Sequence, residues 1–207
     1  STVTSLTGLA LQEAGYKVAV GGNIGEPVLN LLMDHIEYDV FVLELSSFQL
    51  ETTYSLSSAS STILNISEDH MDRYLGLEDY ISAKTRVFSG TDLAVIPAGL
   101  SERGLIHQEA LVHFTLSEQV INLEKDYHLL KQHGKQYLAR GGEALVPVDQ
   151  IKLQGNHHLM NALAMMALCQ PFNVQAEHFE TVLSSFSGLP HRTELVVLHE
   201  GVSWIND

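Results

Sequence analysis

The stretch Tyr38-Asp39-Val40-Phe41-Val42-Leu43-Glu44-Leu45 contains the longest strand-like apolar run near the start of the chain. Its apolar residues are continuous rather than alternating, which is typical of a parallel strand covered on both faces. Similar short runs at Val18–Val20, Ser61–Ile66 and Leu93–Ile96 predict three further strands. This half of the chain therefore predicts a parallel sheet.

Segments with helical spacing separate these runs. Ser1–Ala14 is apolar on one side and is followed by Gly15, Pro27 suits the first turn of the next helix, and Leu77–Phe88 predicts another helix. The inner side of that last helix is formed by Tyr80, Ile81, Ala83 and Val87. The alternation predicts an α/β fold, a mostly parallel sheet flanked by helices with right-handed crossovers.

The second half has a different pattern. Three short runs predict a small antiparallel addition at one edge of the sheet, with a turn at His133-Gly134. They are Leu111–Phe114, Tyr127–Leu130 and Gln136–Leu138. Two helices and a closing strand-turn-strand unit should follow: Asn156–Cys169, Ala176–Phe186, and Glu194–Leu198 with Val202–Ile205.

Composition narrows the class of protein. The chain of 207 residues has 11 Lys and Arg against 25 Asp and Glu, a net charge of −14, which argues against nucleic-acid binding. No apolar run is long enough to span a bilayer, so no membrane association is expected. Cys169 is the single cysteine. It indicates a reducing compartment, the cytoplasm, and its apolar surroundings predict a buried residue rather than a nucleophile.

Polar residues follow the strands of the predicted sheet. Glu44 and Ser46 end one strand, His70 follows another beside acidic residues, and Asn23 lies in the glycine-rich loop Gly21–Gly25. In open parallel sheets the ligand crevice lies outside the carboxyl ends of the strands. The sequence therefore predicts a site on this edge.

Each candidate has a functional and a plain structural interpretation. Glu44 is either a ligand of a hard cation such as Mg²⁺ or a strand end that is solvated or ion-paired, and His70 is either a metal ligand or a surface residue at the start of a helix. Taken alone, Lys84 is expected to be a solvated lysine on the surface of a helix. Ser1-Thr2 reads as a helix N-cap, since the Gly and Lys of a phosphate-binding loop do not precede it.

Taken together, these segments resemble the Mur ligases of bacterial cell-wall synthesis over essentially the whole chain. The resemblance rests on motifs in a fixed order: Ser1-Thr2-Val3-Thr4, Gly21-Gly22-Asn23-Ile24-Gly25, Glu44-Leu45-Ser46-Ser47-Phe48-Gln49-Leu50-Glu51, Asn65-Ile66-Ser67-Glu68-Asp69-His70-Met71-Asp72-Arg73, Lys84, Gly188-Leu189-Pro190-His191-Arg192 and Trp204-Ile205-Asn206-Asp207. The third motif is similar to the members of the family that add D-glutamate.

This resemblance implies an ATP-dependent amide-bond ligase. Its partners would be ATP, UDP-N-acetylmuramoyl-L-alanine and D-glutamate, joined through an acyl phosphate, with two Mg²⁺ ions as cofactors. It also implies that residues 1–187 form the central ATP-binding domain, lacking its first strand and phosphate-loop Gly and Lys. Residues 188–207 would begin a C-terminal Rossmann-like domain. A fragment of this kind should be inactive alone, and the full-length enzyme is expected to be a monomer.

The resemblance also assigns roles to single residues. Ser1 and Glu44 would hold the first ion, and His70 and Lys84 the second, with Lys84 N6-carboxylated and both residues catalytic. The remaining assignments place Ser1, Thr2, Asn161, Arg192 and Asp207 on ATP, and Asn23, Ser46 and His70 on the nucleotide-sugar substrate.

One departure affects the nucleotide site, because His158 stands where the family usually has Asn before the adenine-contacting Asn161. Two alternatives to the D-glutamate reaction remain open. One is a sister Mur or folylpolyglutamate-type ligase acting on another amino acid. The other is a nucleotide-binding domain without catalysis.

Overall fold

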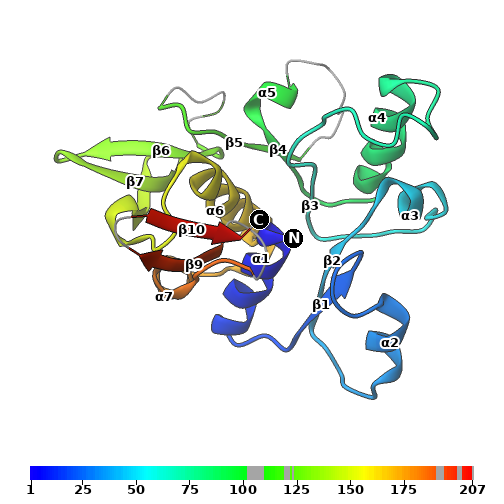
Figure 1. The fold of residues 1–207 in the computed structure, drawn as a ribbon, viewed down its shortest axis with the longest axis horizontal. Helices are drawn as coiled ribbons and strands as arrows, with labels where there is room; N and C mark the ends of the chain where they lie inside the picture. The colour runs from blue at the N-terminus through cyan, green and yellow to red at the C-terminus, as the bar shows by residue number, and fades with distance from the viewer. Residues whose placement is uncertain (102–109, 119–121, 123, 190–193, 200–201, 207) are drawn as a thin grey trace.

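The computed structural model describes residues 1–101, 110–118, 122, 124–189, 194–199 and 202–206 (Figure 1). The chain begins with α1 (Thr2–Glu13), followed by β1 (Val18–Gly22), α2 (Val28–Met33) and β2 (Val40–Glu44). β1 and β2 pair in parallel with Val18 opposite Val40. α1 packs against both strands and against a later helix, so it connects this first unit to the rest of the molecule.

A six-stranded sheet forms the centre of the molecule, in the order β3-β4-β5-β6-β7-β8. Its neighbours are parallel from β3 to β6 and antiparallel from β6 to β8. The elements of this part are α3 (Ser47–Glu51), β3 (Ser61–Thr62), α4 (Leu77–Thr85), β4 (Ala94–Pro97), α5 (Ala98–Ser101), β5 (Leu111–Phe114), β6 (Tyr127–Gln132), β7 (Lys135–Arg140) and β8 (Glu143–Pro147). The prediction of a mostly parallel sheet flanked by helices is confirmed.

The core lies where α6 (Asn156–Leu168) packs against α1 and the central strands. Six consecutive residues of α6, from Ala162 to Ala167, are completely buried, because the helix packs between α1 and the strands β4, β5 and β6, while α7 (Ala176–Ser185) packs against α1 and β8. β9 (Glu194–His199) and β10 (Val202–Asn206) close the chain as an antiparallel hairpin. Among the described residues no helix is long and apolar enough to cross a membrane.

Three details of the sequence prediction are corrected. β5 pairs in parallel with β4 and β6, so only β6, β7 and β8 form the antiparallel part, and β8 was not predicted. β3 ends at Thr62 instead of Ile66 because only Ser61 and Thr62 find partners on β4. β2 is less covered than its apolar run predicts: Phe41 is 38% exposed because β1 is the one described strand that pairs with β2.

The fully buried side chain of Leu163 on α6 yields a stability prediction. Leu163→Ala leaves a cavity among large neighbours and should lower the free energy of unfolding by about 2–5 kcal/mol in urea titrations. The matched control is Leu75→Ala, since Leu75 is 100% exposed and its loss should change stability by less than about 0.5 kcal/mol. Equal effects of the two substitutions would contradict this description of the core.

A second prediction concerns Cys169, which is buried as the sequence indicated. Burial raises the pKa of its thiol from 9.0 to about 12. Because the thiolate is the reactive form, the folded chain should resist thiol reagents at pH 8 and become labelled in denaturant. An unfolded thiol ionises from about pH 9, so the stability that this group contributes is complete below that pH and is lost as pH rises towards 12. Rapid labelling of the folded chain at pH 8 would contradict the placement.

Candidate functional site

Glu44 stands at the carboxyl end of β2 and faces the first turn of α1. Its Oε2 atom lies 2.7 Å from the amino group of Ser1, and the hydroxyls of Ser1 and Thr4 donate to its oxygens at 3.5 and 3.4 Å. Burial alone would raise the pKa of Glu44. The hydrogen bonds from the hydroxyls of Ser1 and Thr4 act in the opposite direction and lower the pKa. The strand thus ends in a carboxylate that accepts hydrogen bonds from the start of α1.

The Glu44 carboxylate and the Ser1 hydroxyl form an oxygen pair of the kind that hard divalent cations bind. An octahedral Mg²⁺ holds its ligands at about 2.1 Å, so two ligand oxygens lie about 3–4 Å apart. The 3.5 Å between Ser1 Oγ and Glu44 Oε1 fits this spacing. In the described part of the chain no three His, Cys, Asp or Glu side chains group to hold an ion unaided. An ion here therefore needs further ligands, such as phosphate oxygens or water.

The glycine-rich loop after β1 is held against the same strand end. The backbone N–H of Asn23 donates to the carbonyl oxygen of Glu44 at 2.7 Å. Gly22 makes this approach possible: its φ of +108° is unfavourable for other residues, and an added Cβ would overlap the Glu44 carbonyl oxygen. The Asn23 side chain remains exposed beside Glu44.

Ser46 is the N-cap of α3, in a reciprocal capping box with Gln49. The Gln49 N–H donates to Ser46 Oγ at 3.3 Å, and the Ser46 N–H donates to Gln49 Oε1 at 2.9 Å. The Ser46 hydroxyl is thus engaged in starting the helix. The other end of α3 is held by Arg86, which donates to the carbonyl oxygens of Leu50 and Thr53 at 2.9 and 3.2 Å.

His70 lies in the loop beyond β3, with the left-handed φ of 54°. A non-glycine residue is held there only by its surroundings, and such strain often marks functional positions. Its ring is half exposed, 4.9 Å from the ring of Phe48, and its Nε2 lies 3.6 Å from Asp69 Oδ2. The contact with Phe48 on α3 places His70 beside the segment that follows Glu44.

Lys84 lies in the last turn of α4, where its Nζ donates to the hydroxyl of Tyr80 at 3.0 Å. α3 and α4 contact one another, and Arg73 in the loop before α4 forms an ion pair with Glu51 of α3. A polar groove of about 390 Å³ lies at this junction, lined by Glu51, Arg73, Tyr74, Asp79, Ser82, Ala83 and Arg86. Lys84 is not among the residues that line this groove; its side chain is half-buried against Tyr80.

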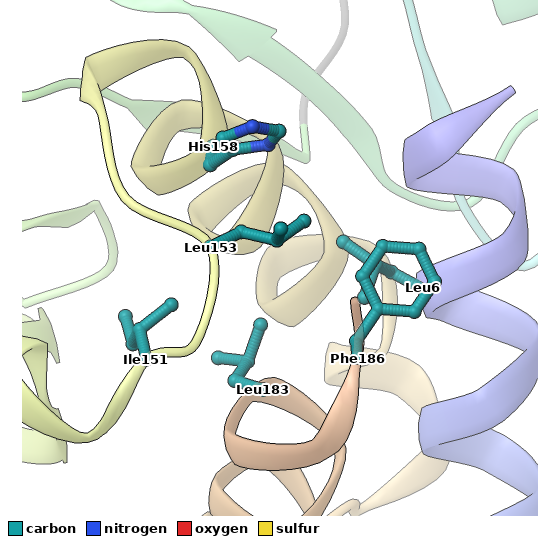
Figure 2. Close-up of a pocket in the computed structure, with 6 residues that line it drawn as sticks. All are labelled: Leu6, Ile151, Leu153, His158, Leu183 and Phe186. Carbon is teal, nitrogen blue, oxygen red and sulfur yellow. The ribbon is translucent and has the colours of Figure 1, made fainter. Parts of the chain in front are cut away.

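The amino end of α6 contains the predicted adenine-contacting segment. Asn161 is half-buried, and the rings of His157 and His158 lie 3.9 Å apart. Burial, followed by the charge of His157, lowers the pKa of His158, whose Nδ1 is buried without a hydrogen-bond partner. Figure 2 shows His158 above a small pocket, which it lines with Leu6, Ile151, Leu153, Leu183 and Phe186. At about 10 Å³ this pocket has room for no more than one water.

The structure brings Ser1, Glu44 and Asn23 together through direct contacts. Thr2 lies half-buried in the same helical turn as Ser1. His70 and Lys84 are connected to each other, through the aromatic side chains of Phe48, Tyr74 and Tyr80. Arg192 and Asp207 lie outside the described residues.

Sequence reasoning missed the roles of Gln49 and Arg86. The Gln49 role was detectable, because Ser-x-x-Gln before an apolar residue is a capping-box pattern. The Arg86 role was not, since its acceptors are carbonyl groups more than thirty positions away.

Solved structures identify the fold. The whole chain overlays a UDP-N-acetylmuramate-alanine ligase of Thermotoga maritima with a TM-score of 0.67 at 21% identity, covering 47% of that chain. It also overlays a pseudomurein peptide ligase type C of Methanothermus fervidus with a TM-score of 0.70 at 16% identity, covering 50% of that chain. The fold is therefore that of the murein and pseudomurein peptide ligases.

Sequence comparison identifies the family. The Mur ligase middle domain matches residues 1–169, so the chain belongs to the Mur ligase family. It is 54% identical over its full length to a UDP-N-acetylmuramoylalanine–D-glutamate ligase of Hydrogenovibrio crunogenus, and 44% identical to the enzyme of that name from Haemophilus influenzae. The chain spans 46% of the length of each of these relatives. The resemblance noted in the sequence is confirmed.

The contact between Gly22 and Glu44 can be tested by comparing two glycines. Gly22→Ala should lower the free energy of unfolding by more than Gly15→Ala. Both residues have positive φ, 108° and 93°, but a Cβ at Gly15 meets nothing within 4 Å. The strain of a positive φ, about 1–3 kcal/mol, is common to both, and the excess at Gly22 measures the overlap with the Glu44 carbonyl. Equal losses in urea unfolding would show that the loop does not press on β2.

Proposed function

We propose that this chain is the ATP-handling part of a ligase that joins D-glutamate to UDP-N-acetylmuramoyl-L-alanine in peptidoglycan precursor synthesis. The observation that carries the proposal is the Glu44 carboxylate held at the amino end of α1 by Ser1 and Thr4. A helix amino terminus with a hydroxyl and a cation-binding carboxylate suits the phosphates of ATP. The names of the similar relatives support the choice of substrates.

In this proposal the reaction has two stages. The substrate carboxylate attacks the γ-phosphate of ATP and gives an acyl phosphate and ADP. The amine of D-glutamate then attacks the acyl carbon and phosphate leaves. Bound Mg²⁺ supplies neutralisation of the phosphoryl charge. The residues of this chain position the reactants: Ser1 and Glu44 at the first ion and the ATP phosphates, with Thr2 beside them.

The second ion is assigned to His70 and to Lys84 in its N6-carboxylated form. Carboxylation would turn an amine into an anionic oxygen donor, the type of ligand that Mg²⁺ prefers. The partial exposure of Lys84 supports this assignment, because a half-buried amine can still meet CO₂ and water. The exposure of His70 likewise leaves its ring nitrogens accessible.

The substrates are assigned to the surrounding residues. Asn23 and His70 would contact the nucleotide-sugar, with Ser46 supporting that edge as the N-cap of α3. Asn161 would reach the adenine, Arg192 the ATP phosphates and Asp207 the ribose. With His158 in place of Asn, the adenine loses an amide partner beside Asn161.

We further propose that residues 1–187 are the central domain and residues 188–207 the start of the next. β2 pairs only with β1, and β3 only with β4, among the described strands, and α1 contacts both β2 and the helix α6 that covers β3. A parallel strand ending just before Ser1 would pair with β2 on one side and β3 on the other. The chain would then pass from that strand through α1 to β1 in a right-handed crossover. The loop at the end of such a strand would bring phosphate-binding residues beside Glu44.

The full-length enzyme would act as a monomer in the cytoplasm, where ATP and nucleotide-sugars are available, and its product would serve cell-wall growth and division. The 207-residue chain alone should bind nucleotide without completing the ligation.

The test uses the full-length parent enzyme. It should release phosphate from ATP when UDP-N-acetylmuramoyl-L-alanine and D-glutamate are both present. Lys84→Ala should lower kcat by about 10- to 100-fold, the usual cost of losing a metal-site group. Lys135→Ala is the matched control, because Lys135 is an exposed lysine paired with Asp149.

Equal turnover with L-glutamate or another amino acid would favour a sister ligase. Nucleotide binding without turnover would favour a non-catalytic domain. An unchanged rate in Lys84→Ala would refute the second-ion assignment.

A further inference from the structure

A row of aromatic side chains joins Lys84 to His70. Tyr80 contacts Tyr74 edge-on at 5.2 Å between ring centroids, and Tyr74 stacks on Phe48 at 6.2 Å. Phe48 in turn contacts the ring of His70 at 4.9 Å. The row crosses from α4 through the loop before it to α3, and its two ends are the residues assigned to the second ion. Aromatic pairs in these geometries are attractive beyond the area they bury.

Tyr80 is the member of the row that touches Lys84. The two residues are four positions apart on α4, so their side chains lie on the same side of the helix. Nζ of Lys84 donates to the Tyr80 hydroxyl at 3.0 Å and lies 4.9 Å from the centre of the Tyr80 ring. Tyr80 is 5% exposed and is fixed among its neighbours, whereas Lys84 is only half-buried.

A free lysine side chain populates many rotamers, and holding its end in one place costs conformational entropy. We propose that Tyr80 is a positioning residue, whose hydroxyl fixes Nζ of Lys84 at its end of the aromatic row. The aromatic row then sets the spacing of Lys84 from His70. This proposal rests on the proposed function, which assigns the carboxylated amine of Lys84 to the second ion.

The chemistry of carboxylation is consistent with this role. The neutral amine of Lys84 forms a nitrogen–carbon bond to CO₂, one carbon–oxygen π bond becomes a lone pair on oxygen, and one proton leaves the nitrogen to water. The carbamate nitrogen keeps one N–H. That N–H can donate to the Tyr80 hydroxyl as the amine did, which leaves both carboxylate oxygens available to a cation. The same hydrogen bond therefore serves the lysine before and after modification.

The experiment removes one oxygen atom from the 207-residue chain. Tyr80→Phe keeps the ring and its stacking but deletes the acceptor. The rate at which an N-hydroxysuccinimide acetate ester acylates Lys84 is measured by peptide mass spectrometry, relative to exposed Lys135. The matched control is Tyr16→Phe, which removes a tyrosine hydroxyl that donates to the carbonyl oxygen of Phe172 instead of accepting from Lys84. Protection of the buried thiol of Cys169 reports that each variant is folded.

Freed from its acceptor, Lys84 should be acylated about 3- to 10-fold faster in Tyr80→Phe, the range expected for one hydrogen bond, and should be unchanged in Tyr16→Phe. An unchanged ratio of Lys84 to Lys135 in Tyr80→Phe overturns the proposal. If Tyr80→Phe does not fold, the wild-type chain decides the question by NMR. Lys84 side-chain protons that exchange with water as fast as those of Lys135 overturn it as well.

A second measurement separates this proposal from the proposed function. Wild type and Tyr80→Phe are equilibrated with ¹³C-bicarbonate, and the carbamate carbon is observed by NMR with Lys84→Ala as the blank. A carbamate signal that is weaker in Tyr80→Phe supports both ideas. A signal of equal strength in both, with equal acylation, overturns the positioning role alone. Absence of the signal in wild type, with altered acylation, supports the positioning role and removes the carboxylated lysine from the proposed function.

Discussion

The carboxylate of Glu44 meets the first turn of α1 at the end of β2, and the arrangement of the site depends on this contact. Glu44 ends an apolar strand, so it needs donors, and the amino end of a twelve-residue helix provides them together with a favourable dipole. The contact joins α1 to β2, while the backbone of the same glutamate receives the N–H of Asn23. One residue therefore aligns a helix, a strand and a glycine-rich loop.

The second half of the site depends on α3. This helix of five residues, Ser47–Glu51, is too short to be stable from backbone hydrogen bonds alone. It is held at its start by the Ser46–Gln49 capping box and at its end by Arg86. On its surface Phe48 receives both His70 and Tyr74. The loop with His70 and the helix with Lys84 therefore both pack against α3, the short helix that follows Glu44.

Much of the fold was predictable because strands and helices follow local periodicity. The continuous apolar run of β2, the spacing in α1 and α6 and the turn at His133-Gly134 all appear where expected. The errors in the predicted strands arose where the direction or the length of a strand depends on its pairing with neighbouring strands. β5 looks like any short strand, and its parallel direction follows only from its neighbours, while β3 ends early because β4 offers no further partners.

The sequence by itself determined the α/β class, the family, the buried thiol of Cys169 and the polar residues that follow the strands, since each depends on residue order and spacing. Only the tertiary structure decided which hydroxyls face the Glu44 carboxylate, that the Ser46 hydroxyl caps a helix, and that Lys84 bonds to Tyr80 at the end of an aromatic row. These are contacts between side chains whose partners are chosen by packing. Distances of a few ångströms between segments forty residues apart, such as Ser1 and Glu44, arise when the chain folds.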